Sequence, residues 1–464
     1  MAVSLEQSCV SSVFSPSVFG GPAFCNVTIT YTHPGHHDST IVETWLPLAW
    51  NERLMGVGGS GYAAGRVDYS YMYGGVAQGY ATVTTDAGLG SAQEPSPWAL
   101  DSPGNVNLYN LQNLGFVSLN ESAMIGKSLI KSFYEQEPTY SYWIGCSQGG
   151  RQGLMLAQRY PEVYDGIVAG APAISHLVTS NTLWPQQIMN ELGEYPYPCE
   201  FDAIVEAAVS ACDGLDGVVD GVISDADACL GAFDPFSVVG TSTACAQADG
   251  ADKIITEAAA TVVNATWRGM VTADGETRLP GLLPGVDLSG NLLGLGGIAA
   301  TTCGEDACAG APSFLGSTWV RFFLARNVAF DLANLTRKEF DTLVHAGDYF
   351  SSLLDAVDPD LRAFKAAGGK MVSYHCLAGG TVPPGATENY YKAVSDISPD
   401  LRVWVENGTT PEYTPISVTV GNATHDRILC PYPQRAAYRR DCGDASKVKC
   451  WYCSSGSTVS RSGK

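Results

Sequence analysis

A glycine-flanked motif, Gly145-Cys-Ser-Gln-Gly149, lies between a β-favouring run at residues 140–144 and an amphipathic stretch that begins at Gly150. In this setting the motif predicts a sharp strand-to-helix turn, on which Ser147 takes a strained backbone conformation that only small neighbours two positions away permit. Such a turn places the hydroxyl above the carboxyl edge of a parallel sheet and over a helix N-terminus. We therefore expect an α/β fold in which Ser147 is a nucleophile.

The first 175 residues alternate short apolar runs with amphipathic stretches, which is typical of a mostly parallel sheet covered by helices. We expect strands at residues 28–31, 54–56, 81–84, 140–144 and 166–169, and helices at 121–133 and 150–159. The apolar side of the first helix is assigned to Met124, Leu129, Ile130 and Phe133.

The pattern changes at about residue 176, where loops rich in glycine, proline and cysteine replace the strand–helix alternation. The alternation returns as a helix at 361–367, a strand at 370–374 and a helix at 387–394, followed by β-like runs at 403–405 and 416–420. The chain therefore divides into a first core part (1–175), an inserted domain (176–355) and a second core part (356–464).

The composition limits which partners the protein can bind and in which cellular compartment it works. The 464 residues carry a net charge of -21, which repels nucleic acid and anionic lipid, and no apolar run approaches the roughly 18 residues of a membrane-spanning helix. The 14 cysteines, together with six Asn-x-Ser/Thr acceptors, favour a secreted glycoprotein with disulfides. The start lacks the pattern of a signal peptide, so secretion implies that a leader has been removed or that the start was placed too late.

An oxyanion hole is expected beside Ser147. The backbone N–H of Gln148 begins the following helix and is free to bind a developing oxyanion. A second donor is expected from Gly58 or Gly59, in the glycine-rich loop that follows the strand at 54–56. That loop fits a plain turn equally well.

An acidic loop at residues 212–222 places three aspartates within eight residues, separated by glycines that let the chain curl. Oxygen ligands on a tight turn suit a hard cation such as Ca²⁺, although the spacing is not that of an EF-hand and a solvated acidic turn explains it equally well. The expected ligands are the carboxylates of Asp213, Asp216 and Asp220 and the carbonyls of Val218 and Val222. Cys229 lies 17 residues after Cys212, and a disulfide between them would close the loop.

Three segments together resemble the tannase and fungal feruloyl esterase family: residues 142–153 (YWIGCSQGGRQG), 79–86 (GYATVTTD) and 165–172 (DGIVAGAP). The resemblance extends over most of the chain. It implies a secreted serine carboxylesterase for phenolic esters, gallate or ferulate, with an α/β-hydrolase core, an inserted lid domain and a calcium ion at the five lid positions named above. It also implies an acyl-enzyme on Ser147 and a disulfide from Cys146 to a cysteine directly after the catalytic histidine.

The chain departs from the family pattern at the other catalytic positions. The family segment His-Gly-x-Ala-Asp corresponds to residues 375–379, so the acid position falls on Gly379. After the helix at 387–394 the family continues with a strand and a Pro-Gly-x-Gly-His-Cys loop, whereas this chain passes from Asp400 to Trp404, where the match resumes. We therefore expect the acid and the His-Cys pair to be missing and Cys146 to lack its partner.

None of the seven histidines is a strong replacement base. His33, His36, His37, His176 and His345 are expected on the surface or in loops, and His425 is a weak candidate in a loop beside Asp426. His375-Cys376 is not expected to substitute, because an intervening strand should hold it roughly 10 Å from Cys146, beyond the about 7 Å between Cα atoms that a disulfide permits. Two hypotheses follow: a serine esterase, or a catalytically impaired or non-catalytic binding protein of the same fold.

Overall fold

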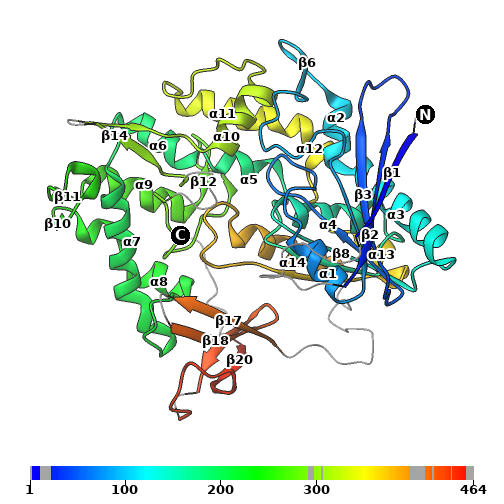
Figure 1. Ribbon diagram of the computed structural model, residues 1–464. Helices are drawn as coiled ribbons and strands as arrows, with labels where there is room; N and C mark the ends of the chain where they lie inside the picture. Colours follow the sequence, from blue (N-terminus) through cyan, green and yellow to red (C-terminus); the bar gives the residue numbers. More distant parts are fainter. Residues whose placement is uncertain are drawn as a thin grey trace.

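The computed structural model describes residues 3–10, 22–290, 297–304, 307–397, 413–420, 423–439 and 441–455. The expected strand at 403–405 lies outside these ranges. Figure 1 shows a central sheet with helices around it, a helical insertion on one side and C-terminal hairpins apart from the sheet. No helix of the described ranges has both the length and the apolar character that crossing a bilayer requires.

The central sheet has eight strands in the order β1-β2-β3-β5-β4-β8-β9-β16. The first three are antiparallel and the last five are parallel to one another. All six strands expected here are confirmed, while β1 and β3 were not predicted. The bounds are β1 Val3–Val10, β2 Phe24–Tyr31, β3 Thr40–Pro47, β4 Arg53–Val57, β5 Ala81–Thr85, β8 Tyr140–Cys146, β9 Gly166–Gly170 and β16 Lys370–Tyr374.

Helices cover both faces of this sheet. Consecutive residues of a strand point to opposite faces, and in β5 Thr82 lies under Gly75 of α1 (Ser70–Ala77) while Val83 lies under Gly126 of α3 (Ser118–Tyr134). A third helix, α4 (Gln148–Arg159), packs on β8 and β9. Small residues at these contacts let the helices approach the strands closely.

The predicted apolar side of α3 is partly wrong. Ile130 is fully buried, but Met124 is 61% exposed and Phe133 is 37% exposed. The buried face of the helix consists mainly of small residues, among them Ser122, Ala123 and Gly126. Contact with the sheet therefore selects for small size rather than hydrophobicity on this face, which a hydrophobic pattern does not reveal.

The inserted region is mostly helical, with short two-stranded sheets at its edge. Its elements are α5 His176–Asn181, α6 Trp184–Leu192, α7 Pro198–Cys212, α8 Ala226–Ala232, α9 Glu257–Arg268, α10 Phe314–Thr318, α11 Arg337–Ala346, α12 Ser351–Leu354, β10 Ser242–Thr243, β11 Lys253–Ile254, β12 Met270–Val271, β13 Thr277–Leu279, β14 Thr301–Cys303 and β15 Cys308–Gly310. Shorter elements between β5 and α3 are β6 Leu100–Ser102, β7 Asn105–Val106 and α2 Leu108–Gln112. The proposed division of the chain at residues 175 and 355 stays a prediction.

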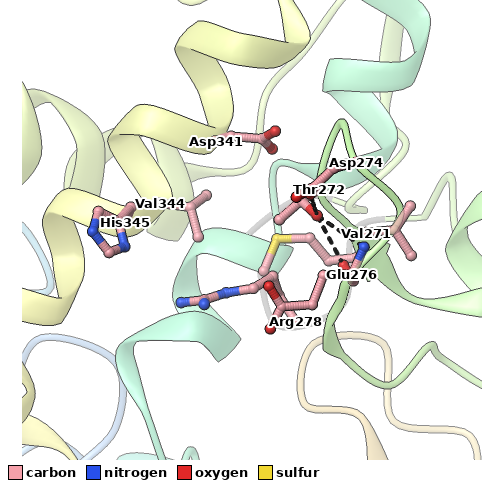
Figure 2. A pocket seen from close by; sticks show the side chains of 9 residues that line it. Val271, Thr272, Asp274, Glu276, Arg278, Asp341, Val344 and His345 are labelled. Atoms are coloured by element: carbon pink, nitrogen blue, oxygen red, sulfur yellow. Dashed lines mark hydrogen bonds between the residues drawn. The ribbon is translucent and has the colours of Figure 1, made fainter.

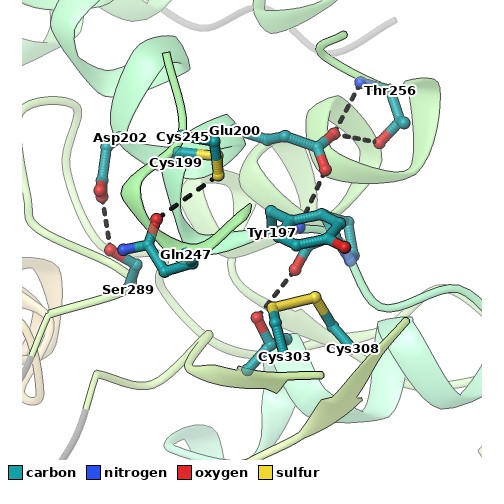
Figure 3. Close-up of a disulfide and its surroundings, with 12 residues drawn as sticks. Tyr197, Cys199, Glu200, Asp202, Cys245, Gln247, Thr256, Ser289, Cys303 and Cys308 are labelled. Atoms are coloured by element: carbon teal, nitrogen blue, oxygen red, sulfur yellow. Dashed lines mark hydrogen bonds between the residues drawn. A yellow bond between two sulfur atoms is a disulfide. The ribbon is translucent and has the colours of Figure 1, made fainter. Parts of the chain in front are cut away.

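Disulfides and a buried carboxylate hold the insertion together. Bonds join Cys199 to Cys245 and Cys303 to Cys308 (Figure 3). Between them the carboxylate of Glu200 accepts hydrogen bonds from the backbone N–H groups of Tyr197 and Thr256, both at 2.8 Å, and so links the starts of α7 and α9. The expected oxidised cysteines are therefore present.

The C-terminal region adds one strand to the sheet. After α13 (Arg362–Ala366), β16 pairs with β9 and is the last strand in the order, and α14 (Pro384–Ile397) follows. Val372 in β16 is 45% exposed, so this edge lies open among the described residues. The hairpins β17–β18 (Thr414–Val420, Ala423–Leu429) and β19–β20 (Gln434–Tyr438, Trp451–Ser455) lie outside the sheet, beside α8 (Figure 1).

Candidate active site

Ser147 occupies the turn between β8 and α4, with φ 58° and ψ -115°. This is a left-handed conformation that a non-glycine residue adopts only under strain. A Cβ on Gly145 would lie 2.5 Å from the carbonyl carbon of Gly149, and a Cβ on Gly149 would lie 3.1 Å from the carbonyl oxygen of Gly59. Both glycines of the motif are thus required by close backbone approach, and the predicted turn is confirmed.

Backbone hydrogen bonds fix the turn on the carboxyl edge of the sheet. The N–H of Ser147 donates to the carbonyl of Gly170 at 3.0 Å, and its carbonyl accepts from the N–H of Ala173 at 3.1 Å. Ser147 is partly exposed, and its hydroxyl has no hydrogen-bond partner in the described part of the chain. The serine is thus positioned and accessible, but no side chain of the described ranges accepts its proton.

The expected oxyanion donors differ in their availability. The N–H of Gln148, at the start of α4, donates to no residue of the described ranges. By contrast, Gly58 N–H donates to the carbonyl of Ile144 at 3.0 Å, and Gly59 N–H donates to Oε1 of Gln152 at 2.9 Å. These bonds hold the glycine-rich loop against β8 and α4, so they count against Gly58 and Gly59 as oxyanion donors in this conformation.

Cys146, directly before the nucleophile, is a free thiol, and so is the exposed Cys376. Strand β9 lies between β8 and β16 in the sheet, as expected, so the two cysteines follow strands two positions apart. Burial raises the pKa of the Cys146 thiol, and the charge of Cys376 adds to this effect. The prediction that Cys146 lacks its partner is confirmed.

The segment after β16 contains His375 but no catalytic acid. The ring of His375 lies between Oγ1 of Thr387, 2.8 Å from Nδ1, and the carbonyl of Val382, 2.9 Å from Nε2. Since Nε2 donates to a carbonyl, Nδ1 accepts from the hydroxyl, and burial lowers the pKa of the ring. His375 therefore holds the loop together, and Gly379 at the end of this loop has no side chain that could orient an imidazole.

Two of the other histidines lie in places that the sequence analysis did not anticipate. His176 is buried at the start of α5, where Nδ1 lies 3.0 Å from Asp355, and is not a surface residue. His425 lies on strand β18 and not in a loop. His33 lies in a loop as expected, partly buried between two carboxylates, and His345, on helix α11, is 81% exposed as expected.

A cavity of about 320 Å³ opens in the insertion, away from the strand-to-helix turn. It lies between the β12–β13 hairpin and α11 and is lined mainly by charged side chains, including Glu276, Arg278 and Asp341 (Figure 2). None of its lining residues belongs to β8, α4 or the loop after β16. It is therefore not a substrate pocket of Ser147.

The acidic loop has a defined structure. Both carboxylate oxygens of Asp213 accept backbone N–H groups, from Asp220 at 2.9 Å and Gly221 at 3.0 Å. One oxygen of Asp216 accepts the N–H of Val218, whereas the other is buried without a hydrogen-bond partner in the described part of the chain. The guanidinium of Arg427, on β18, pairs with Asp220. The predicted Cys212–Cys229 disulfide is confirmed.

The donor set of this loop fits a hard cation in part. Calcium prefers oxygen ligands, and three oxygens of the loop are available to it. The free carboxylate oxygen of Asp216 has no partner among the described residues, and the carbonyls of Val218 and Val222 accept no hydrogen bond from them. Asp213 and Asp220, however, are engaged with N–H groups and Arg427. Calcium binding therefore requires Asp220 to exchange Arg427 for the ion, whereas each carboxylate oxygen of Asp213 keeps a lone pair that its N–H partner does not occupy.

Arg151 is a buried residue of the site that the sequence analysis missed. Its guanidinium donates to Oε1 of Gln148 and to three carbonyls, those of Leu114, Gly115 and Leu354, at 2.8–3.0 Å. Leu114 and Gly115 belong to a π-helical turn, Asn113–Val117. Burial lowers the pKa of Arg151 to about 10. A single charged residue in the otherwise uncharged stretch from Gln148 to Ala157 is the signal that could have identified it.

Comparison with known proteins agrees with this geometry. The family model described as "Tannase and feruloyl esterase" matches residues 25–400. A probable feruloyl esterase from Arthroderma benhamiae is 35% identical, over 92% of this chain and 85% of its own length, and a tannase from Aspergillus oryzae is 27% identical, over 92% and 86%. The solved structure of a tannin acyl hydrolase from Aspergillus niger superimposes with a TM-score of 0.83 at 26% identity, over 97% of this chain and 90% of that one.

Proposed function

Because the chain belongs to the tannase and feruloyl esterase family, we propose that it is a carboxylic ester hydrolase for phenolic esters of the gallate or ferulate type, with Ser147 as its nucleophile. The observation that carries the proposal is the strained backbone of Ser147 at the strand-to-helix turn, at the N-terminus of α4. The hydroxyl oxygen of Ser147 attacks the ester carbonyl carbon, the alcohol leaves, and water then hydrolyses the acyl-enzyme. Gln148 N–H and the α4 dipole stabilise the oxyanion.

We also propose that Ser147 lacks the base that its attack requires in this chain, so that the slow residual hydrolysis comes mainly from solvent water beside the oxyanion donor. Serine needs a base to take its proton, and the base needs an oriented tautomer. Gly379 stands at the acid position, both ring nitrogens of His375 are engaged, and no described histidine is hydrogen-bonded to Ser147. These observations also favour the second candidate function, a protein of this fold that binds phenolic esters without turning them over.

Hydrolysis of methyl ferulate and methyl gallate distinguishes the two functions. We expect the purified chain to exceed the uncatalysed rate by about 10³–10⁴-fold. Binding and an oxyanion donor still supply this acceleration when a triad is incomplete. Ser147→Ala should change this rate little, because nucleophile and base act as a unit. Ser128→Ala, an exposed serine on α3, is the matched control.

Two results of that experiment decide against parts of the proposal. A rate equal to that of buffer, with binding of ferulate or gallate retained, identifies a binding protein. Fast turnover that Ser147→Ala abolishes shows that another residue acts as the base, and the assignment of an incomplete site is then wrong.

We infer an extracellular location. Five disulfides within the described ranges support it: Cys199–Cys245, Cys212–Cys229, Cys303–Cys308, Cys430–Cys453 and Cys442–Cys450. Such bonds persist in oxidising compartments, whereas cytosolic thiols are kept reduced.

We propose that the acidic loop binds a structural Ca²⁺ through Asp213, Asp216 and Asp220 and the carbonyls of Val218 and Val222. Adding calcium should raise the melting temperature and EGTA should reverse the rise, with a stabilisation of about 2.7 kcal/mol at 100-fold excess over Kd. Asp216→Ala should abolish the response, and Asp252→Ala, an exposed aspartate outside the loop, should retain it. A calcium-independent melting curve of the unmodified chain removes the site.

A further inference from the structure

We propose that the loop between β2 and β3 carries a zinc site built from His33, His36 and Asp38. One ligand atom from each of these three side chains lies within 4.8 Å of the other two. In the described ranges no other group of three histidine, cysteine, aspartate or glutamate side chains meets this criterion. The site is separate from the esterase proposal and does not depend on it.

A tight turn brings the three side chains together. The N–H of His36 donates to the carbonyl of His33 at 3.1 Å, and Gly35 between them has φ 85°, in the left-handed region that favours glycine. The N–H of His33 donates to Oδ1 of Asp38 at 2.8 Å, which closes the loop. The imidazole centroids of His33 and His36 are consequently 5.4 Å apart.

One polar atom of this group has no protein partner among the described residues. Nδ1 of His36 is buried and has no hydrogen-bond partner within the described ranges, although the ring itself stacks on Tyr109 at 3.8 Å between centroids. Oδ2 of the buried Asp38 lies 2.5 Å from Nδ1 of His33 and also accepts from Nδ2 of Asn113 at 3.1 Å. A buried ring nitrogen without a partner is unfavourable, and a metal ion would satisfy it.

A further carboxylate holds His33 from its other side. Nε2 of His33 lies 2.8 Å from Oε1 of Glu121 on α3, and Oε2 of Glu121 accepts the hydroxyl of Tyr31 at 2.6 Å. In metal sites a carboxylate on the second ring nitrogen fixes the tautomer and orientation of the ligating histidine. Glu121 stands in this position if Nδ1 of His33 faces the ion.

The donor set selects the metal. Two imidazole nitrogens and one carboxylate oxygen suit Zn²⁺, which takes three protein ligands and leaves a fourth position for water. The loop lies at the same edge of the sheet as Ser147, because the start of β3 pairs with the end of β5. Three strand spacings separate β3 from β8, or about 14 Å, so the ion would fasten the β2–β3 loop to α3 and would not contact the nucleophile.

Zinc binding by the purified full chain tests the proposal, with ZnCl₂ as the probe and dialysis followed by elemental analysis as the readout. We expect one Zn²⁺ per chain, at least 100-fold weaker binding in His36→Phe, which keeps the ring stacked on Tyr109, and unchanged binding in His37→Ala. His37 is the adjacent, exposed histidine outside the group and is therefore the matched control. Glu121→Gln should weaken binding by about 10–100-fold.

The same experiment distinguishes zinc bound at this site from zinc bound by the free cysteines or by the acidic loop. Cys146→Ser/Cys376→Ser and Asp216→Ala should retain the zinc, and Co²⁺ bound in its place should lack the charge-transfer absorption of a thiolate ligand. Three results overturn the proposal: no stoichiometric binding, binding that His36→Phe and Asp38→Asn leave unchanged, or binding lost in the double cysteine variant. Circular dichroism confirms that each variant is folded.

Discussion

Restoring the missing catalytic groups should raise kcat/KM on methyl ferulate or methyl gallate by a factor on the order of 10⁴, since losing one member of a triad removes about that much. The restored chain carries Gly379→Asp together with the strand and Pro-Gly-x-Gly-His-Cys loop of the family, inserted after Asp400. The gain arises because the imidazole can then accept the proton of Ser147 as the hydroxyl attacks. Steady-state kinetics of both chains on one ester measure it.

The structure permits the substitution at residue 379. A Cβ on Gly379 would lie 3.4 Å from the carbonyl oxygen of Cys376 and 3.8 Å from that of Val382, which are ordinary contacts. The open edge at β16 is available for the inserted strand. Gly379→Asp alone is the control and should gain nothing, because an acid without a histidine has nothing to orient. Ser147→Ala in the restored chain should remove the gain; if it does not, Ser147 is not the nucleophile.

Arg151→Met should lower the free energy of unfolding by about 3–5 kcal/mol, because it leaves two buried carbonyls and one partly buried carbonyl without their donor. Those carbonyls belong to Leu114, Gly115 and Leu354, so one guanidinium joins α4 to two segments that are distant in the sequence. Such a loss is a large part of the 5–15 kcal/mol that stabilises a typical native protein. Urea denaturation followed by circular dichroism measures it.

Arg159→Met is the matched control for this prediction, since Arg159 lies on the same helix but is exposed. Its substitution should change the unfolding free energy by less than about 1 kcal/mol. Equal effects of the two substitutions would show that the Arg151 hydrogen bonds contribute little net stability, and the buried network would not be what joins these segments.

Most of the central sheet could be predicted because its parallel strands are buried on both faces. Strand β5, for example, is buried at every position, and such strands appear as short apolar or β-branched runs between turns. Strand β3 was missed, although it too is almost wholly buried, because Glu43 and Thr44 interrupt its apolar run. Glu43 is tolerated there because Trp45, Tyr69 and Arg66 donate hydrogen bonds to it, and the last two lie 26 and 23 residues away in the sequence.

The candidate site was predicted where local sequence determines it. Gly145, Ser147 and Gly149 form one turn, and their spacing between a β-favouring run and an amphipathic stretch specifies the geometry. Gly58 and Gly59 were predicted as oxyanion donors from their position in a loop. The side chain of Gln152, 93 residues after Gly59, however, accepts the N–H of Gly59. Likewise, Glu121 is 88 residues from His33. Contacts of this kind depend on how the elements pack, which spacing does not encode.

The pH dependence of ester hydrolysis by the unmodified chain tests most directly whether Ser147 lacks a base. Without a base, the log of kcat/KM should rise steadily with pH as hydroxide replaces it, with no inflection between about pH 5 and 8, the range in which histidine titrates. Ser147→Ala should give the same profile. An inflection in that range, lost in Ser147→Ala and in one histidine variant such as His375→Ala, would contradict the account by showing a working serine–histidine pair.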